Sequence, residues 1–362
     1  MERTGNFRSV STLGILASLV IVLAGVKVAS DIIVPFLMAL FIAIIFKPFA
    51  NALHKKGVPN WLALTIIILV ILIFIGLLVT LITVTVQNFS ARMPFYNEKL
   101  LIQRDHFLAL ANRYHLHIDQ EQLNSFFDPA KIMGFVAAAL RSFSDILSNG
   151  LLILITIIFI FIESNVFHKK VQFIVKDEHK LRFFREINEQ LNHYMLIKSI
   201  TSAATGLVLG GVLAVAGIDY ALLWGVIAFM LNYIPSIGSL IAAIPPIILT
   251  LVQYGLPQAL LVTLLFAGVN FLIGSIIEPR LMGQGLGLSI LIIFISLIFW
   301  GWILGPVGMF LALPLTLVIK IILHSQQETR WISVLLGNGS EIPDYPLPAH
   351  KLPEPDHSKP SV

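Results

Sequence analysis

The chain has 362 residues, of which 57% are hydrophobic and only 12% are charged. An ordinary soluble domain is about 45–50% apolar and about 25% charged, so this composition excludes a typical soluble protein. The formal net charge is +4, and the basic residues lie in short loops beside apolar blocks, which argues against a nucleic-acid partner. Because the sequence contains no cysteine, disulfides and thiol catalysis are also excluded.

Long apolar blocks recur along the chain and indicate membrane helices. The block over 61–86 has no charged residue, and at about 1.5 Å per residue it is longer than the roughly 30 Å apolar core of a bilayer. Backbone polar groups in lipid must be paired within their own segment, so we expect helices. The expected membrane segments are 11–29, 31–49, 61–86, 147–164, 199–217, 219–234, 236–252, 257–277, 288–303 and 306–323.

These segments predict an all-α, polytopic integral membrane protein with about eight membrane helices, including two broken or re-entrant helix pairs in an inverted repeat. Two polar regions interrupt the spans, and apolar stripes in them are typical of surface helices. The expected divisions are three membrane helices in 1–86, an extracytoplasmic helical insertion in 87–145, a fourth membrane helix in 146–165, a cytoplasmic amphipathic helix in 166–198, an inverted-repeat transport core in 199–325, a short amphipathic helix in 326–337 and a disordered tail in 338–362.

The distribution of lysine and arginine predicts the orientation in the membrane. The loop 165–198 has seven basic and four acidic residues, and the loop 50–60 contains Lys55 and Lys56, so both are expected in the cytoplasm. The N-terminus resembles a signal peptide, but its long apolar run favours a retained first span. We therefore expect a multi-pass protein of the bacterial inner membrane with both termini in the cytoplasm.

Two apolar pairs in the second half are joined by uncharged breaks rich in proline and glycine. Proline removes a backbone donor and glycine permits unusual dihedral angles, so a helix should stop and restart at each break. Interrupted helices in inverted repeats point to the binding site of a transporter. Ordinary short spans joined by tight turns are the alternative. The residues expected to line the solute path are Asn232, Tyr233, Pro235, Gly238, Ser239, Gly301, Gly305 and Gly308.

Charged residues near the membrane are few, and most lie at span ends, where a side chain such as that of Lys198 can reach the surface. Glu278 and Arg280 lie between the two repeats. They could form an ion pair that fixes the loop, or Glu278 could act as a gate or a proton-coupling carboxylate. Asp219 is a second candidate for coupling.

Small residues recur every fourth position at Ser202, Gly206, Gly210 and Ala214. Such a stripe allows another helix to approach closely, so we interpret it as a packing surface. The sequence has no phosphate-binding loop, no zinc-protease motif and no serine-hydrolase motif. We therefore expect no enzymatic activity, no cofactor and no bound metal.

Several of these motifs occur together in a known family. The sequences Asn-Tyr-Ile-Pro-Ser-Ile-Gly-Ser at 232–239, Glu-Pro-Arg-Leu-Met-Gly at 278–283 and Phe-Trp-Gly-Trp at 299–302 resemble the autoinducer-2 exporter family, and the likeness covers about residues 12–325. The resemblance implies an inner-membrane homo-oligomer that exports the quorum-sensing molecule autoinducer-2. Since some relatives are assigned cation/proton antiport, it also implies that activity as an alternative.

The predicted function is export of a small polar solute, autoinducer-2, across the lipid bilayer. A sodium(lithium)/proton antiporter is the first rival, and it needs a titratable carboxylate such as Glu278 or Asp219. A scaffold without transport activity is the second rival, in which regions 87–145 and 166–195 bind partners on opposite sides of the membrane.

Overall fold

The computed structural model is helical almost throughout its described residues, and only an isolated antiparallel bridge joins Leu288 to Gly337 there. The expected all-α class is therefore confirmed. The expected tail from residue 340 onward, the first 13 residues and most of 114–149 lie outside the described residues. The structure describes residues 14, 17, 18, 20–113, 128, 131, 134–138, 150–174, 178–235, 237–282 and 287–339.

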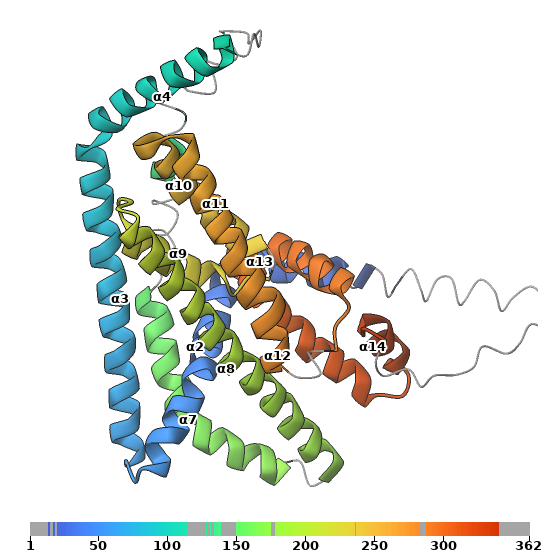
Figure 1. Ribbon diagram of the computed structural model, residues 1–362. Helices are drawn as coiled ribbons and strands as arrows, with labels where there is room; N and C mark the ends of the chain where they lie inside the picture. Colours follow the sequence, from blue (N-terminus) through green and yellow to red (C-terminus); the bar gives the residue numbers. More distant parts are fainter. Residues whose placement is uncertain are drawn as a thin grey trace, which may run out of the picture.

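The first half contains two long apolar helices, α2 (Ser30–Lys55) and α3 (Asn60–Ala91). The turn between them contains Gly57, whose φ of 81° suits a residue without a side chain. After α3, the chain bends at Arg92 and continues as α4 (Met93–Arg113). Figure 1 shows α3 as a long helix along one edge of the molecule, with α4 leaving its end at an angle. The expected insertion therefore begins as a helix.

The structure differs from the expected separate surface helix over 166–198. The helix α7 (Gly150–Ile174), which covers the expected fourth membrane helix, extends into this region. A single helix, α8 (Glu178–Val215), covers most of the rest and the following expected span. The residues from 178 to 198 include neither proline nor glycine, so no local signal ends the helix. Tyr194 and Met195 are buried, which shows that the inner part of this stripe packs within the protein.

The second half contains shorter elements around the helix breaks. Within the described residues, six helices are long and apolar enough to cross a membrane, and two shorter apolar helices add to them, so the expected count of about eight spans stays a prediction. The remaining elements are α9 (Ala221–Leu231), α10 (Ile237–Tyr254), α11 (Leu256–Asn270), the π-helix η1 (Phe271–Ile277), α12 (Glu278–Met282), α13 (Ile290–Ser325) and α14 (Arg330–Leu336).

Helix breaks occur at both expected places. The first lies between the end of α9 and the start of α10, and the second lies within α13 at Gly305, whose φ is 68° and ψ is −155°. The Trp300 indole donates a hydrogen bond to the Thr316 hydroxyl at 3.1 Å. In a straight helix these residues, 16 positions apart, would be about 24 Å apart. The two arms of α13 therefore fold back on each other.

The two breaks contact each other through one hydrophobic cluster. Ile234 from the first break is buried with Leu297 and Ala312 from the two arms of α13. The rings of Tyr233 and Phe310 also lie 4.8 Å apart between their centres. The chain thus brings together two breaks that are about 70 positions apart in sequence. The inverted relation of the two units stays a prediction.

The small-residue stripe of α8 faces α9 at close range. A Cβ atom at Gly206 would lie 2.6 Å from the Gly225 carbonyl oxygen, and one at Gly210 would lie 3.2 Å from the Gly225 Cα. Ser202 is fully buried on the same face, whereas Ala214 is exposed and lies outside the contact. Close approach of the backbones therefore replaces side-chain packing over about two turns.

We expect Gly206→Ala to lower the free energy of unfolding by about 1–3 kcal/mol, because its methyl group would overlap the backbone of α9. The melting temperature of the purified protein in detergent measures the effect. Gly211→Ala is the matched control, since no atom of the described structure lies within 4 Å of a Cβ there. Equal melting temperatures for both variants would contradict the close contact.

Candidate transport site

A buried ion pair joins the middle of α8 to the start of α12. The Lys198 ammonium lies 2.7 Å from Oε1 and 2.9 Å from Oε2 of Glu278, and the Thr201 hydroxyl donates to Oε2 at 3.3 Å. The two charged side chains are only 5% and 15% exposed. A buried charge is tolerated when it is paired and hydrogen-bonded, so each group requires the other.

The position of Glu278 depends on an unusual helix. The seven residues Phe271–Ile277 form a π-helix that links α11 to α12. Pro279 follows Glu278, and a proline ring would clash with the carbonyl group four residues earlier in an α-helix. The π-helix ends two residues before Pro279, where the usual α-helical hydrogen bond would be missing. Because π-helices change the direction in which later side chains point, this segment orients Glu278.

The first helix break is hydrogen-bonded to the same part of α8. The Asn232 amide donates to the Ser202 hydroxyl at 3.0 Å, and the Tyr233 hydroxyl donates to Ser199 at 2.9 Å. The Tyr233 ring also packs edge-on against Phe41 with centres 5.8 Å apart. Residues 198–202, which we call the α8 hub, therefore bind the break on one face and Glu278 on another.

The structure places the expected site residues in different surroundings. Asn232, Tyr233 and Glu278 bind the α8 hub, while Pro235 and Ser239 are partly buried at the first break. The partner of Glu278 is Lys198, and Arg280 is exposed with no ion pair among the described residues. The glycines Gly238, Gly301, Gly305 and Gly308 line the two breaks.

Sequence reasoning missed the part that Lys198 takes in this site. Its side chain was expected to reach the membrane surface, but that interpretation was wrong, because the side chain is buried against Glu278. A useful signal was the run of a lysine and three hydroxyl residues, Ser199, Thr201 and Ser202, inside an apolar helix. Such groups in a membrane helix usually face the protein interior.

An apolar cavity of about 270 Å³ borders the hub on its other side, between α8 and the α11–η1 region. Thr201, Ala204, Val269 and Ile273 are among its lining residues, and no polar surface is exposed in it. Because its lining is apolar, this cavity is unsuited to a polar solute. In the described part of the chain, no group of three or more histidine or carboxylate side chains could hold a metal ion.

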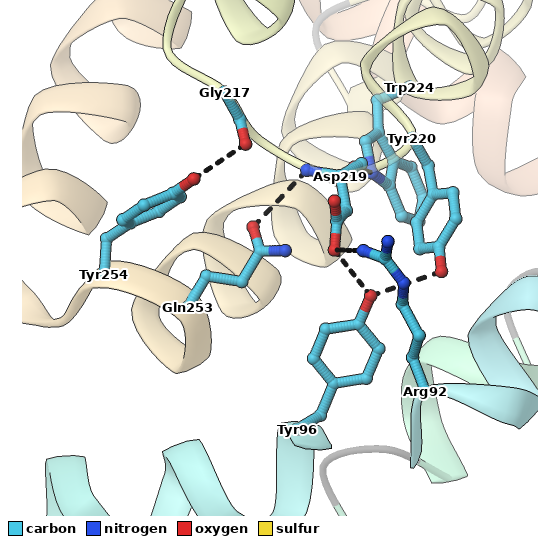
Figure 2. A network of polar contacts seen from close by, with 8 residues as sticks. All are labelled: Arg92, Tyr96, Gly217, Asp219, Tyr220, Trp224, Gln253 and Tyr254. Carbon is cyan, nitrogen blue, oxygen red and sulfur yellow. Dashed lines mark hydrogen bonds and ion pairs between the residues drawn. The ribbon is translucent and has the colours of Figure 1, made fainter. Parts of the chain in front are cut away.

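A second polar cluster ties α4 to the turn between α8 and α9 (Figure 2). Asp219 Oδ2 accepts hydrogen bonds from the Tyr96 hydroxyl at 2.8 Å and from Arg92 Nη1 at 3.0 Å. The Tyr96 hydroxyl also lies 3.2 Å from that of Tyr220. Burial raises the pKa of the Tyr96 phenol, so this hydroxyl stays protonated and remains a donor at ordinary pH.

Side-chain hydrogen bonds to backbone carbonyl groups also hold the turn between α8 and α9. Tyr220 has a φ of 62°, a left-handed conformation that is unfavourable for a residue with a side chain. Trp224 Nε1 donates to the Asp219 carbonyl oxygen at 3.1 Å, and the Tyr254 hydroxyl donates to the Gly217 carbonyl at 2.8 Å. Figure 2 shows the bond from Tyr254 to Gly217, and the two bonds together hold the turn against α9 and α10. Asp219 therefore has a clear structural part in joining α4 to the core.

We expect Asp219→Ala to loosen α4 from the core. The variant removes the charged acceptor of the buried Tyr96 hydroxyl, a bond that contributes about 1.5–3 kcal/mol, while the Arg92 pair adds little because its guanidinium is 58% exposed. Exchange of the backbone amide hydrogens of residues 93–103 and 217–221 should be faster in this variant than in the unchanged protein. Asp105→Ala is the control, since Asp105 is exposed and its ion pair among the described residues is with its sequence neighbour Arg104. Unchanged exchange together with lost proton-coupled flux would make Asp219 a coupling group instead.

Comparison with known proteins identifies the family of this chain. A family model described as AI-2E family transporter matches residues 16–327. The chain belongs to the AI-2E transporter family. The family assignment confirms the resemblance seen in the sequence, and the AI-2E chain is accordingly a multi-pass membrane transporter.

Three relatives of this AI-2E transporter are similar over nearly their whole length. A putative transport protein of Haemophilus influenzae is 40% identical over 89% of this chain and 95% of its own. The AI-2 transport protein TqsA of Escherichia coli is 37% identical, over 89% of this chain and 94% of its own. The putative transport protein YhhT of the same species is 36% identical, over 90% and 93%. The α8 hub and both breaks lie within the region that the family model matches.

Proposed function

We propose that this AI-2E transporter exports autoinducer-2, a small hydroxyl-rich solute, across the bacterial inner membrane. The observation that carries the proposal is the α8 hub: within apolar spans, Asn232, Tyr233 and Glu278 all bind residues 198–202. The similarity to a relative named as an AI-2 transport protein supports the choice of solute.

The proposal includes the orientation predicted from charge. Both termini lie in the cytoplasm, and the pairs α9–α10 and the two arms of α13 are re-entrant parts of an inverted repeat. Copies of the chain assemble into a homo-oligomer. The contact between the two breaks supports the re-entrant pairs, because two re-entrant pairs that enter from opposite sides would meet within the membrane.

In the proposed mechanism, solute hydroxyls exchange with the hydrogen bonds that now join the hub to the first break. Ser199 and Ser202 can each donate and accept, as can the Asn232 amide, so a neutral polyol is bound without a charged clamp. Separation of Asn232 and Tyr233 from α8 would open the path. The ion pair of Lys198 with Glu278 keeps α12 in place until the solute arrives.

Flux in proteoliposomes of the purified chain tests the proposal. Vesicles are loaded with autoinducer-2, and its release is followed with a pH gradient present or absent. Release above that of protein-free vesicles, and its loss in Asn232→Leu, is the expected result. No release under either condition would overturn the exporter.

The antiporter is a second candidate because Glu278 is a partly buried carboxylate within a candidate span and lies beside an ammonium group. Such a carboxylate could exchange a proton for a cation if its bond to Lys198 opened. Proton movement driven by sodium or lithium in the same vesicles, lost in Glu278→Gln, would favour this activity. Asp219 suits coupling less well, since it is bound to Arg92 and Tyr96.

A further inference from the structure

We propose that Lys47, Asn188 and Asn192 form an entry subsite that first binds the transported solute, a small neutral molecule with neighbouring hydroxyl groups. The inference rests on the proposed export function and adds the place at which the solute is held before it reaches the hub. Lys47 lies on α2, and the two asparagines lie one turn apart on α8.

The hydrogen bonds among these three side chains fix the direction of each amide. Asn188 Oδ1 accepts from Lys47 Nζ at 2.9 Å and from Asn192 Nδ2 at 3.2 Å. An oxygen that accepts two bonds has used both lone pairs, and the atom of Asn192 that faces it must be the nitrogen. The oxygen Oδ1 of Asn192 therefore points away from Asn188. It is buried and has no hydrogen-bond partner within the described structure.

The cluster offers both a positive donor and a free acceptor. Lys47 is partly buried, and no carboxylate of the described residues pairs with it. Its ammonium has three donors, of which Asn188 takes one. A buried polar atom without a partner is unfavourable, so a ligand that donates a hydrogen bond to Asn192 Oδ1 would remove this penalty.

These requirements select the chemistry of the ligand. Lys47 needs an oxygen that accepts a hydrogen bond, and Asn192 Oδ1 needs a group that donates one. Neighbouring hydroxyls on one small molecule supply both. A sulfate ion could satisfy Lys47 but has no donor for Asn192. We therefore assign the cluster to a hydroxyl-rich neutral solute and not to an anion.

The position of the cluster connects it with the hub. Asn188, Asn192, Ser199 and Ser202 are spaced by four, seven and three residues, so they share one face of α8. Ser199 and Ser202 bind the first break, and they lie about 16 Å and about 21 Å further along the helix from Asn188. Asn188 lies at the start of the candidate span Ile187–Val215. The cluster is thus at the membrane edge of the α8 face that also carries the two hub serines, with the buried Met195 between them.

Single cysteines can report on this cluster because the natural chain has none. Asn51→Cys places a thiol on the exposed surface of α2, one turn beyond Lys47 on the same face. Ala52→Cys is exposed at the same depth but about 140° away around the helix from Lys47. Neither variant changes Lys47, Asn188 or Asn192, so the subsite is tested intact in the purified full chain.

The measurement is the rate of maleimide labelling in detergent with and without autoinducer-2. We expect the solute to slow labelling of Asn51→Cys severalfold and to leave Ala52→Cys unchanged. Adding Asn192→Leu to Asn51→Cys should remove the protection. Equal rates with and without solute at position 51 would overturn the subsite. Equal protection by sulfate and by autoinducer-2 would also overturn it, because the cluster would then be an anion site.

The labelling experiment and the release experiment test the subsite and the export function separately. Release of autoinducer-2 from proteoliposomes without protection at position 51 would refute the subsite and leave the exporter standing. Protection at position 51 without release would support the subsite and refute export. The two cysteine variants keep the test decisive even if Asn192→Leu does not fold.

Discussion

Replacing Lys198 with methionine is expected to abolish export and to lower the melting temperature markedly. The variant leaves the Glu278 carboxylate buried without its counter-charge, and breaking a buried pair in this way costs about 3–5 kcal/mol. The Thr201 hydroxyl is then the remaining hydrogen-bond partner of Glu278 among the described residues. Autoinducer-2 release from proteoliposomes and the melting temperature in detergent measure the two effects.

A double variant separates the stability of this pair from its part in transport. Lys198→Met combined with Glu278→Met removes both charges, so the melting temperature should recover, since a buried pair can be replaced by apolar side chains at little cost. Export should stay absent if the pair controls the path. Lys170→Met is the matched control, because Lys170 forms an exposed pair with Glu163 on α7. Normal export by Lys198→Met would exclude the ion pair as a gate.

Alanine at Gly238 or Gly308 is expected to prevent correct folding of the core. A Cβ atom at Gly238 would overlap the Leu231 carbonyl group, and one at Gly308 would overlap that of Trp300. In each case the obstacle is backbone, which cannot move aside as a flexible side chain can. We expect a loss above about 3 kcal/mol, seen as aggregation in size-exclusion chromatography of the detergent-solubilised protein.

Two other glycines supply the control for these variants. Gly268 on α11 and Gly274 in the π-helix have no described atom within 4 Å of a built Cβ. Gly268→Ala and Gly274→Ala should therefore give well-behaved protein. If Gly238→Ala and Gly308→Ala were equally well behaved, the close backbone contacts at the two breaks would be disproved.

The positions of the helix breaks could be predicted from the sequence because they depend on local backbone chemistry. Pro235 and Gly238 mark the first break, and the structure ends α9 at Leu231 and starts α10 at Ile237. Gly305 marks the second, where the structure shows a left-handed φ. Proline and glycine act through their own dihedral angles and donors, so their effect does not depend on distant residues.

The start of α8 and its continuity across residue 198 were harder to predict. A charged, amphipathic stretch over 178–198 is typical of a surface helix, yet it continues into a span without interruption. Hydrophobic pattern alone cannot distinguish a surface helix that ends at the membrane from one that enters it. The contacts of Tyr194 and Met195 with other helices decide this, and those contacts are tertiary.

The sequence by itself determined the helical membrane class, the helix breaks and the family, since these follow from composition, local backbone chemistry and ordered motifs. Only the tertiary structure decided which charges are paired. Lys198 meets Glu278 across 80 positions, and Arg92 meets Asp219 across 127. Arg280, two positions after Glu278, is exposed and forms no ion pair among the described residues. Pairing depends on how the π-helix and the packing of α8 direct each side chain, and residue spacing alone contains no measure of that direction.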